Sequence, residues 1–406
     1  MENDMQSALA CLKKGQAPGN REVLEKISVG KDFILDFWRE KYLAHYLARG
    51  GSKIKFLTGR PGSGKTHFLE MLDLEAGNLG YIPVRLSARE IWLHDFKEIY
   101  TAILRQVRLP ERLQRCSREI IRQLGYSPEE IPENISFADY LSAQGQLDPL
   151  TKREIRQQLE KLFLANPLID NNFALACALL TGGVLGHPIL EETGRKLLLL
   201  WLEGNREASL SSLRRLGLSP SKITKYNARH MLRSLVEVCC LAGYKGLVVS
   251  IDNMEVLVNA DSTETIRYTR LKREDAYESI RELIDEIDTL KNILFVFSFD
   301  RCLIDDDLRG LKSYQALWMR IQNEIENVRF NRFADIVDMD RLIDEVYTPE
   351  VILDMSRRLA QVINTYDRGA CPFILSTAEE LHARSRFGKV SLPRRVVLTT
   401  LQEGAV

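Results

Sequence analysis

The segment Phe56-Leu-Thr-Gly-Arg-Pro-Gly-Ser-Gly-Lys-Thr-His-Phe-Leu69 joins an apolar run to an amphipathic one through a loop rich in glycine. Glycines in this loop permit backbone conformations that other residues avoid, so successive N–H groups can point at one anion. Lys65 would reach the β- and γ-phosphates, and Thr66 would offer its hydroxyl to Mg²⁺. A helix that begins at Lys65 adds the positive end of its dipole. The segment therefore predicts a P-loop that binds ATP with Mg²⁺.

The flanking pattern argues against a chance match to GxxxxGK[ST], because an apolar strand precedes the loop and an amphipathic helix follows it. The residues predicted to hold the nucleotide are Gly59, Arg60, Pro61, Gly62, Ser63, Gly64, Lys65, Thr66 and His67.

Strand-like and helical periodicities alternate on both sides of this loop. Strands are predicted at Lys53–Thr58, Tyr81–Leu86, Gly246–Ile251, Asn292–Ser298 and Ala334–Met339. Helices are predicted at Lys31–Ala48, Lys65–Ala76, His94–Val107, Arg273–Leu290 and Tyr314–Val328. Strands that alternate with helices favour an α/β fold with a parallel sheet.

The same pattern divides the chain into four parts. Residues 1–108 carry the P-loop and the first part of the core, and residues 109–241 form a large helical insertion between two strands. Residues 242–345 complete the core, and residues 346–406 form a C-terminal helical lid. Within the lid, Pro349 suits a first helical position, Ser376 with Glu379 forms a capping box, and Ser391 precedes a last helix.

A second apolar strand, Gly246–Ile251, ends in a carboxylate. Asp252 would hold Mg²⁺, directly or through water, although an ordinary buried strand can also end in aspartate. Many ATPases of this class have a glutamate next, which polarises the attacking water; this chain has Asn253. An asparagine amide can position water but accepts its proton poorly. Either hydrolysis is slow or Glu255 takes the role.

The end of the third apolar strand offers a further polar group beside the γ-phosphate. Ser298 is the first choice for orienting the attacking water, and Asp300 is the second. A plain turn residue after a buried strand explains either position equally well.

Two arginine pairs stand where ATPases place cations. Arg329 and Arg332 precede the last predicted strand, where ring-forming ATPases have an arginine that reaches the γ-phosphate of the neighbouring subunit. Arg394 and Arg395 stand where a lid arginine would sense the γ-phosphate of the same subunit. A solvated surface arginine is the alternative for both pairs.

The chain has 56 basic and 56 acidic residues, so net charge gives no argument for nucleic-acid binding. A local basic stretch without acids, Arg214–Arg233, could contact the phosphates of duplex DNA, or could be a solvated face. Its basic members are Arg214, Arg215, Lys222, Lys225, Arg229, His230 and Arg233. Tyr226 is its one aromatic residue, so base stacking is not indicated.

The seven cysteines show no CxxC spacing, which fits free thiols in a reducing compartment and argues against a zinc site. The polar N-terminal region predicts no signal peptide. Phe173–Trp201, the most apolar stretch, contains glycines, a proline and a charged pair, so it predicts buried helices instead of a membrane span. We therefore expect a cytoplasmic protein.

Longer segments resemble known families. Phe56–Leu69 is similar to the AAA+ ATPases related to archaeal and eukaryotic origin-recognition proteins. Leu86–Phe96, Ala242–Asp252 and Leu311–Trp318 resemble the BREX-system ATP-binding proteins of the BrxD type. The resemblance implies a bacterial anti-phage defence component that acts with a methyltransferase and other proteins on DNA. It also implies an AAA+ P-loop NTPase core with sheet order 5-1-4-3-2 and a helical lid.

Three hypotheses of function follow. The first is a homo-oligomeric AAA+ ATPase of a phage-defence complex, in which ATP binding closes the lid and hydrolysis, slowed by Asn253, resets it. The second is a nucleotide-dependent scaffold that binds ATP and hardly hydrolyses it. The third is a transposition-type AAA+ selector of DNA targets.

Overall fold

The computed structural model describes residues 2–132, 134–259, 266–322, 331–366, 370–385 and 387–402. In this part the chain is an α/β structure with a five-stranded sheet, so the predicted α/β class with a parallel sheet is confirmed. The strands are β1 (Ser52–Gly59), β2 (Ile82–Ser87), β3 (Leu247–Asp252), β4 (Ile293–Asp300) and β5 (Ile336–Asp338).

The strands follow the order β5-β1-β4-β3-β2 across the parallel sheet. In the β1–β5 pair, Phe56 lies opposite Ile336 and Thr58 opposite Asp338. Because parallel strands run the same way, their carboxyl ends meet at one edge of the sheet. β1 ends at Gly59, β3 at Asp252 and β4 at Asp300, so this edge gathers the chemically active residues.

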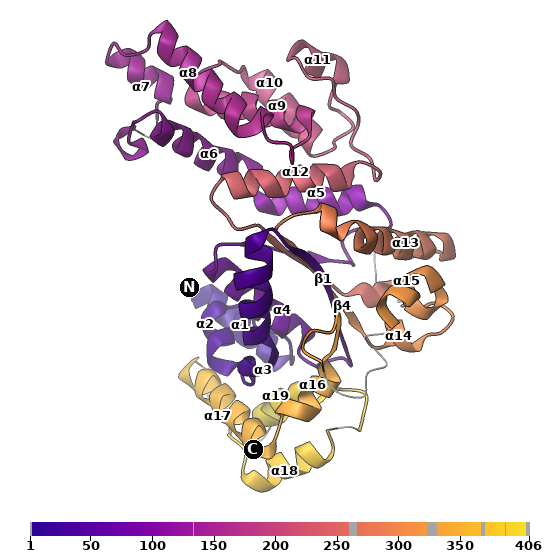
Figure 1. Cartoon of the computed structure of the whole chain (residues 1–406). Coiled ribbons are helices and arrows are strands. Elements are labelled where there is room, and N and C mark those ends of the chain that lie inside the picture. The colour runs from indigo at the N-terminus through magenta and orange to yellow at the C-terminus, as the bar shows by residue number, and fades with distance from the viewer. Residues whose placement is uncertain are drawn as a thin grey trace. The chain divides into compact units, whose positions relative to one another are not determined.

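The chain divides into two compact units, which we name the core unit and the helical unit. The core unit comprises Met1–Glu90, Val248–Ile287 and Leu294–Val406, and it contains nearly all of the sheet. Its helices are α1 (Glu2–Lys13), α2 (Arg21–Ile27), α3 (Lys31–Trp38), α4 (Lys65–Asn78), α13 (Arg270–Glu286), α14 (Cys302–Asp305), α15 (Gln315–Ile321), α16 (Met339–Val346), α17 (Pro349–Tyr366), α18 (Leu375–Ala383) and α19 (Leu392–Gln402) (Figure 1).

The helical unit comprises Ile91–Leu247 and Asp288–Ile293. It begins before the predicted insertion because α5 packs against α12. Its helices are α5 (Phe96–Val107), α6 (Leu109–Gln123), α7 (Phe137–Ala143), α8 (Pro149–Leu159), α9 (Asn171–Leu185), α10 (Glu192–Leu202), α11 (Leu210–Arg215) and α12 (Ala228–Leu241).

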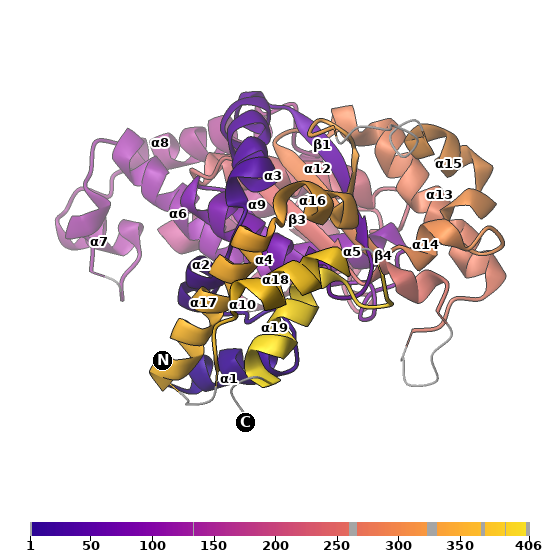
Figure 2. The ribbon, with the colours of Figure 1, turned by 90° about the horizontal axis from the view of Figure 1, so that it is seen from below.

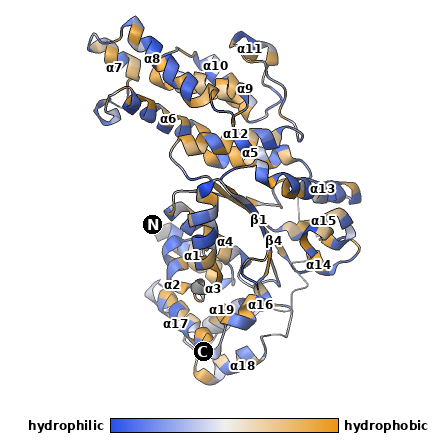
Figure 3. Cartoon of the chain, in the orientation of Figure 1, coloured by the Kyte–Doolittle hydropathy of each residue, from blue (hydrophilic) through white to orange (hydrophobic). Residues whose placement is uncertain are grey.

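The helices of both units carry hydrophobic and hydrophilic faces, and α9 is largely hydrophobic (Figure 3). The apolar stretch Phe173–Trp201 falls on α9 and α10, and its residues Phe173, Cys177 and Leu198 are fully buried. Among the described residues, no helix is long and apolar enough to cross a membrane.

The C-terminal helices share a hydrophobic cluster with the N-terminal helix. α17 packs against α18 and α19, and α1 packs on α19 (Figures 1 and 2). Leu12 of α1 is buried with Ile352, Leu359, Leu392 and Val396 of the C-terminal helices. Burial of such side chains stabilises each by about 1.5–3 kcal/mol, so α1 is an integral part of the C-terminal cluster.

Two expectations for local structure need correction. The predicted helix Lys31–Ala48 is α3 followed by a π-helical run over Arg39–Tyr46 and a 3₁₀ turn over Leu47–Arg49. The capping box of Ser376 with Glu379 is wrong, because Ile374 is the N-cap of α18 and Ser376 is already the second residue of that helix. The buried Phe373, whose N–H donates to Ser356 Oγ at 2.9 Å, holds the chain just before that start.

Within the predicted helix Tyr314–Val328 the structure has α15, and residues 323–328 of that prediction lie outside the described residues. Ser391 immediately precedes α19, as expected, but its hydroxyl donates to Asp340.

A partly buried carboxylate links α4 to β2. Asp73 Oδ2 lies 2.6 Å from Arg85 Nη2, and Glu70 Oε1 lies 3.3 Å from Arg85 Nη1. Burial raises the pKa of Asp73 from 3.8 to about 6 despite this pairing. The folded chain thus holds the Asp73 proton more tightly than the unfolded chain does. The stabilisation from that proton is full below pH 3.8 and is lost as the pH rises through about 6.

We therefore expect the contribution of Asp73 to the free energy of unfolding of the wild-type chain to fall by about 2–3 kcal/mol between pH 4 and pH 7. Asp73→Asn should lack this pH-dependent contribution. Denaturant titrations across that pH range would measure the free energy of unfolding of both proteins. Asp354→Asn is the control, because Asp354 is a half-exposed carboxylate paired with Arg358. An unchanged pH slope in Asp73→Asn would contradict the prediction.

Candidate nucleotide site

The loop between β1 and α4 has the backbone that its glycines suggested. Gly62 and Gly64 have φ values of +83° and +88°, a region that side chains disfavour. A Cβ atom at Gly59 would lie 2.6 Å from Ser63 Oγ, so that position has no room for a side chain. α4 begins at Lys65, directly after this loop.

A cavity of about 530 Å³ opens beside the loop, within the size range of small-molecule sites. Its lining includes residues of the loop, namely Pro61, Gly62, Gly64, Lys65, Thr66 and His67. The lining also includes the apolar side chains of Ile27, Val29, Met355 and Val397. A cavity with both polar and apolar lining suits a ligand with a phosphate tail and a flat base.

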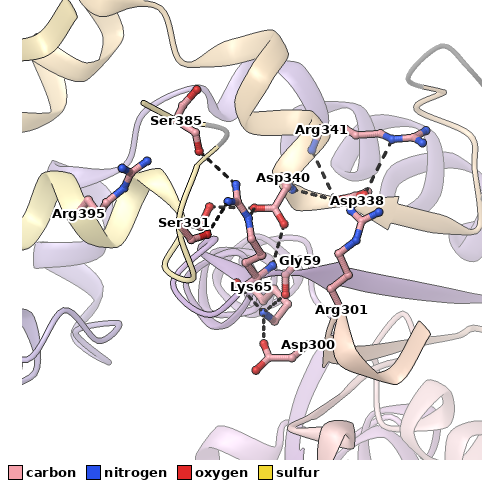
Figure 4. Close-up of polar contacts among 12 residues, drawn as sticks. Gly59, Lys65, Asp300, Arg301, Asp338, Asp340, Arg341, Ser385, Ser391 and Arg395 are labelled. Carbon is pink, nitrogen blue, oxygen red and sulfur yellow. Dashed lines mark hydrogen bonds and ion pairs between the residues drawn. The ribbon is translucent and has the colours of Figure 1, made fainter. Parts of the chain in front are cut away.

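Lys65 lines the cavity, and its ammonium group makes polar contacts with Gly59 and Asp300 (Figure 4). Its Nζ donates to Gly59 O at 2.8 Å, to Arg60 O at 3.2 Å and to Asp300 Oδ1 at 2.6 Å. An ammonium group has three donors, so these three acceptors use them all. Asp300 is therefore the group with which a phosphate would compete for Lys65.

Thr66 and Asp252, the two residues expected to hold Mg²⁺, meet at the cavity. Thr66 Oγ1 donates to Asp252 Oδ2 at 2.8 Å, while the N–H of Asn253 donates to Asp252 Oδ1 at 2.9 Å. In the described part of the chain, no group of three or more His, Cys, Asp or Glu side chains could hold a metal. A hydroxyl and one carboxylate fit Mg²⁺, which usually keeps several waters and binds substrate phosphates.

The turn at Asn253 brings Glu255 into the cavity. Asn253 has φ of +64°, a left-handed conformation that asparagine tolerates, and the 3₁₀ turn Met254–Leu257 follows it. Ser87 Oγ donates to Asn253 Oδ1 at 3.1 Å, which fixes the amide. Both Asn253 and Glu255 line the cavity with Asp252.

Glu255 is a buried carboxylate in an acidic setting, with 5% of its surface exposed. Its Oε1 pairs with Arg89 at 3.2 Å, and its Oε2 accepts the N–H of Asp300 at 3.3 Å. Burial raises the pKa of Glu255, and repulsion from Asp300 and Asp252 raises it further. A carboxylate with a raised pKa is a better proton acceptor near neutral pH.

The structure separates the two residues considered at the end of β4. Ser298 is fully buried in the sheet and does not line the cavity, so the first choice is not supported. Its hydroxyl finds no hydrogen-bond partner among the described residues. Asp300, the second choice, lines the cavity and binds Lys65.

The candidate arginines also differ in position. Arg394 lines the cavity, and its Nη2 donates to Lys14 O at 3.2 Å. Arg395 donates to Arg384 O at 2.8 Å and lies outside the cavity lining. Arg332 lies over the ring of Phe33 at 4.4 Å, also away from the cavity. Arg329 falls outside the described residues.

Sequence reasoning missed several contributors. The chain between α1 and α2 lines the cavity through Gly15, Gln16, Ala17 and Pro18, and its glycines and proline were the only signal. Arg89 follows β2 and reaches Glu255, without any motif that marks it. His67, which was predicted, lines the cavity and shares a 2.8 Å hydrogen bond with Ser28 Oγ.

A parallel sheet, a glycine loop, a buried lysine and a carboxylate at the end of β3, all around one cavity, are compatible with a P-loop nucleotide-binding protein. The family model for the BREX system ATP-binding protein BrxC/D matches residues 2–380. The chain therefore belongs to the BrxC/BrxD family of BREX-system ATP-binding proteins, which supports ATP as its ligand. No curated protein and no solved structure matches it.

Proposed function

We propose that this chain is an AAA+ ATPase of the BrxD type that acts in a BREX anti-phage complex on DNA. The observation that carries the proposal is the meeting of Lys65, Thr66, Asp252 and Glu255 around one cavity. The strand order and the C-terminal helices α16–α19 support the AAA+ assignment.

The residues suggest a division of labour. The P-loop N–H groups and Lys65 bind the phosphates. The Lys65 ammonium then exchanges its bond to Asp300 for a bond to a phosphate oxygen. Thr66 and Asp252 would hold Mg²⁺. The positive charge of this ion would stabilise the negative charge that develops on the phosphates during hydrolysis. Glu255 accepts a proton from the attacking water. Arg394 adds a cation from α19, and its buried Nε has no hydrogen-bond partner among the described residues. Arg332 stays a candidate for a contact in trans within a homo-oligomer.

A nucleotide-dependent scaffold with little hydrolysis is the second candidate, favoured by one contact. Arg89 holds Glu255 Oε1 at 3.2 Å, and an asparagine stands where a catalytic glutamate is common. Phosphate release measured with and without duplex DNA separates the two. Turnover that Lys65→Ala abolishes supports the ATPase, and tight ATP binding without turnover supports the scaffold.

The basic stretch of the helical unit offers a surface for DNA. Arg214 and Arg215, which end α11, are exposed, as are Lys222, Lys225 and His230. Arg229 differs, because its guanidinium lies over the ring of Phe96 at 5.0 Å. Exposed cations that neutralise phosphates release counterions, so their contribution depends on salt.

We expect the combined variant with Arg214, Arg215, Lys222 and Lys225 replaced by alanine to bind duplex DNA about tenfold or more weakly. The slope of log K against log salt should shrink by roughly 0.9 for each DNA phosphate that the variant no longer neutralises. Fluorescence anisotropy at several salt concentrations measures both. Arg195→Ala with Lys196→Ala is the control, because both cations pair with Glu192 on α10. If the slope of log K against log salt is the same in the two variants, the basic stretch does not contact DNA phosphates.

A further inference from the structure

One carboxylate on the first turn of α16 joins the P-loop to the C-terminal helices (Figure 4). Asp340 Oδ2 accepts the main-chain N–H of Arg60 at 2.8 Å, and Asp340 Oδ1 accepts Arg60 Nε at 3.2 Å. The same Oδ1 accepts the hydroxyl of Ser391, the residue before α19, at 2.9 Å. The Asp340 side chain is 12% exposed, so little water competes for these bonds.

The first N–H groups of α19 complete the connection. The first four N–H groups of a helix have no partner within that helix. Here the N–H of Ser391 donates to Pro61 O at 3.0 Å, and the N–H of Arg394 donates to Gly62 O at 3.3 Å. Carbonyl groups of the P-loop therefore cap the start of α19. Because the C=O and N–H of a trans peptide point in opposite directions, the bond to Ser391 also turns the Gly62 N–H away from α19.

The guanidinium of Arg60 extends the connection to the chain between α18 and α19. Its Nη1 donates to Gly388 O at 3.0 Å, and its Nη2 donates to Ser385 O at 3.2 Å. Arg60, Asp340 and Ser391 all lie outside the cavity lining as the structure describes it. They can influence a bound phosphate only through the residues they hold.

The start of α16 also reaches the other side of the phosphate site. Asp338 accepts the N–H of Asp340 at 3.0 Å and binds Arg301 Nη1 at 2.8 Å. Arg301 follows Asp300, the partner of Lys65, and its N–H donates to Gly59 O at 3.3 Å. The turn that contains Asp338 and Asp340 thus contacts the P-loop, the end of β4 and the start of α19.

We propose that Asp340 is a positioning residue that couples phosphate binding in the P-loop to the placement of α19. The inference rests on the proposed function, because it assumes that the P-loop binds a nucleotide. A phosphate that draws the loop amides together displaces residues 60–62. Since Asp340, Ser391 and Arg394 are bonded to those residues, α19 moves with the loop, and Arg394 stays beside the phosphate tail.

The first experiment needs no nucleotide. Amide hydrogen exchange is compared between the wild type, Asp340→Ala, Asp340→Asn and the control Asp354→Asn, whose carboxylate pairs with Arg358 on α17. Residues 388–395 should exchange about tenfold or more faster in Asp340→Ala, since that variant cannot form the charge-assisted bonds. Asparagine keeps the shape of aspartate and one acceptor oxygen, so exchange in Asp340→Asn should be faster than in the wild type and slower than in Asp340→Ala. Asp340→Asn also keeps the test valid if the alanine variant misfolds. Exchange in both Asp340 variants equal to that of the control would overturn the proposal.

The second experiment adds ATP-Mg²⁺. In the wild type ATP should slow exchange of residues 388–395. In Asp340→Ala the Kd should rise about tenfold, and saturating ATP should no longer slow that exchange. Slowing of equal size in the variant would overturn the coupling. Wild-type chain that binds no ATP in calorimetry would overturn the proposed function and the coupling with it, whereas the first experiment would still decide whether Asp340 holds α19 to the loop.

Discussion

Lys65→Ala is expected to abolish measurable binding of ATP-Mg²⁺ in calorimetry. The Lys65 side chain is 9% exposed and its ammonium lies 2.6 Å from Asp300, inside the cavity. Alanine removes the cation that faces the phosphates and leaves the Asp300 carboxylate without it. Loss of a charged hydrogen bond costs about 1.5–3 kcal/mol, and the exposed carboxylate then repels the phosphates. We therefore expect the Kd to rise about 100-fold or more.

Two further variants separate the loss of the Lys65 cation from the repulsion between Asp300 and the phosphates. Asp300→Asn combined with Lys65→Ala removes the repulsion, so part of the affinity should return. Lys53→Ala is the matched control, because Lys53 on β1 is a lysine that pairs with Asp335 outside the cavity lining. Its Kd should equal that of the wild type. A Lys65→Ala protein with unchanged affinity would remove the P-loop from nucleotide binding.

The P-loop and the end of β3 could be predicted because their chemistry is local. Gly62 and Gly64 need positive φ, and that requirement is visible in the residue type itself. Asp252 ends an apolar run, and parallel strands bring such ends to one edge of the sheet. Local requirements and a simple topological rule were therefore enough to place Lys65, Thr66 and Asp252 together.

The structure places Asp300 and not Ser298 at the cavity, and the reason is tertiary. The predicted strand ended at Ser298, whereas β4 continues to Asp300. Each strand residue advances the chain by about 3.3 Å, so a boundary two residues short moves the expected site into the sheet. The true end is fixed by Arg301, whose N–H bonds Gly59 O across the sheet, and no local pattern marks such a contact.

The remaining site residues depend on contacts between distant parts of the chain. Arg60 and Asp340 are 280 residues apart, and Arg89 and Glu255 are 166 apart. Arginines and aspartates are common surface residues, so their type alone gives no sign of such a pairing. Only the folded chain shows which of them meet.

Glu255→Gln is expected to lower ATP hydrolysis by about 100-fold or more while changing the Kd for ATP only a few-fold. Glu255 lines the cavity beside Asp252, and glutamine keeps its shape without the ability to take a proton. Because burial raises the pKa of Glu255 above its usual 4.5, the carboxylate protonates sooner as the pH falls. The wild-type rate should therefore decline on the acid side at a pH above 4.5, and phosphate release across pH measures this.

The matched variant for this test is Asn253→Gly, because glycine adopts the positive φ of Asn253 without strain and removes only its amide. If Glu255 accepts the proton, Asn253→Gly should keep turnover within about tenfold of the wild type. The opposite result, with hydrolysis abolished in Asn253→Gly and kept in Glu255→Gln, would show that Asn253 and not Glu255 acts on the attacking water. If the wild type binds ATP tightly but releases no phosphate, with or without DNA, the result would favour the nucleotide-dependent scaffold. Glu255 would then stay paired with Arg89 and would not take part in hydrolysis.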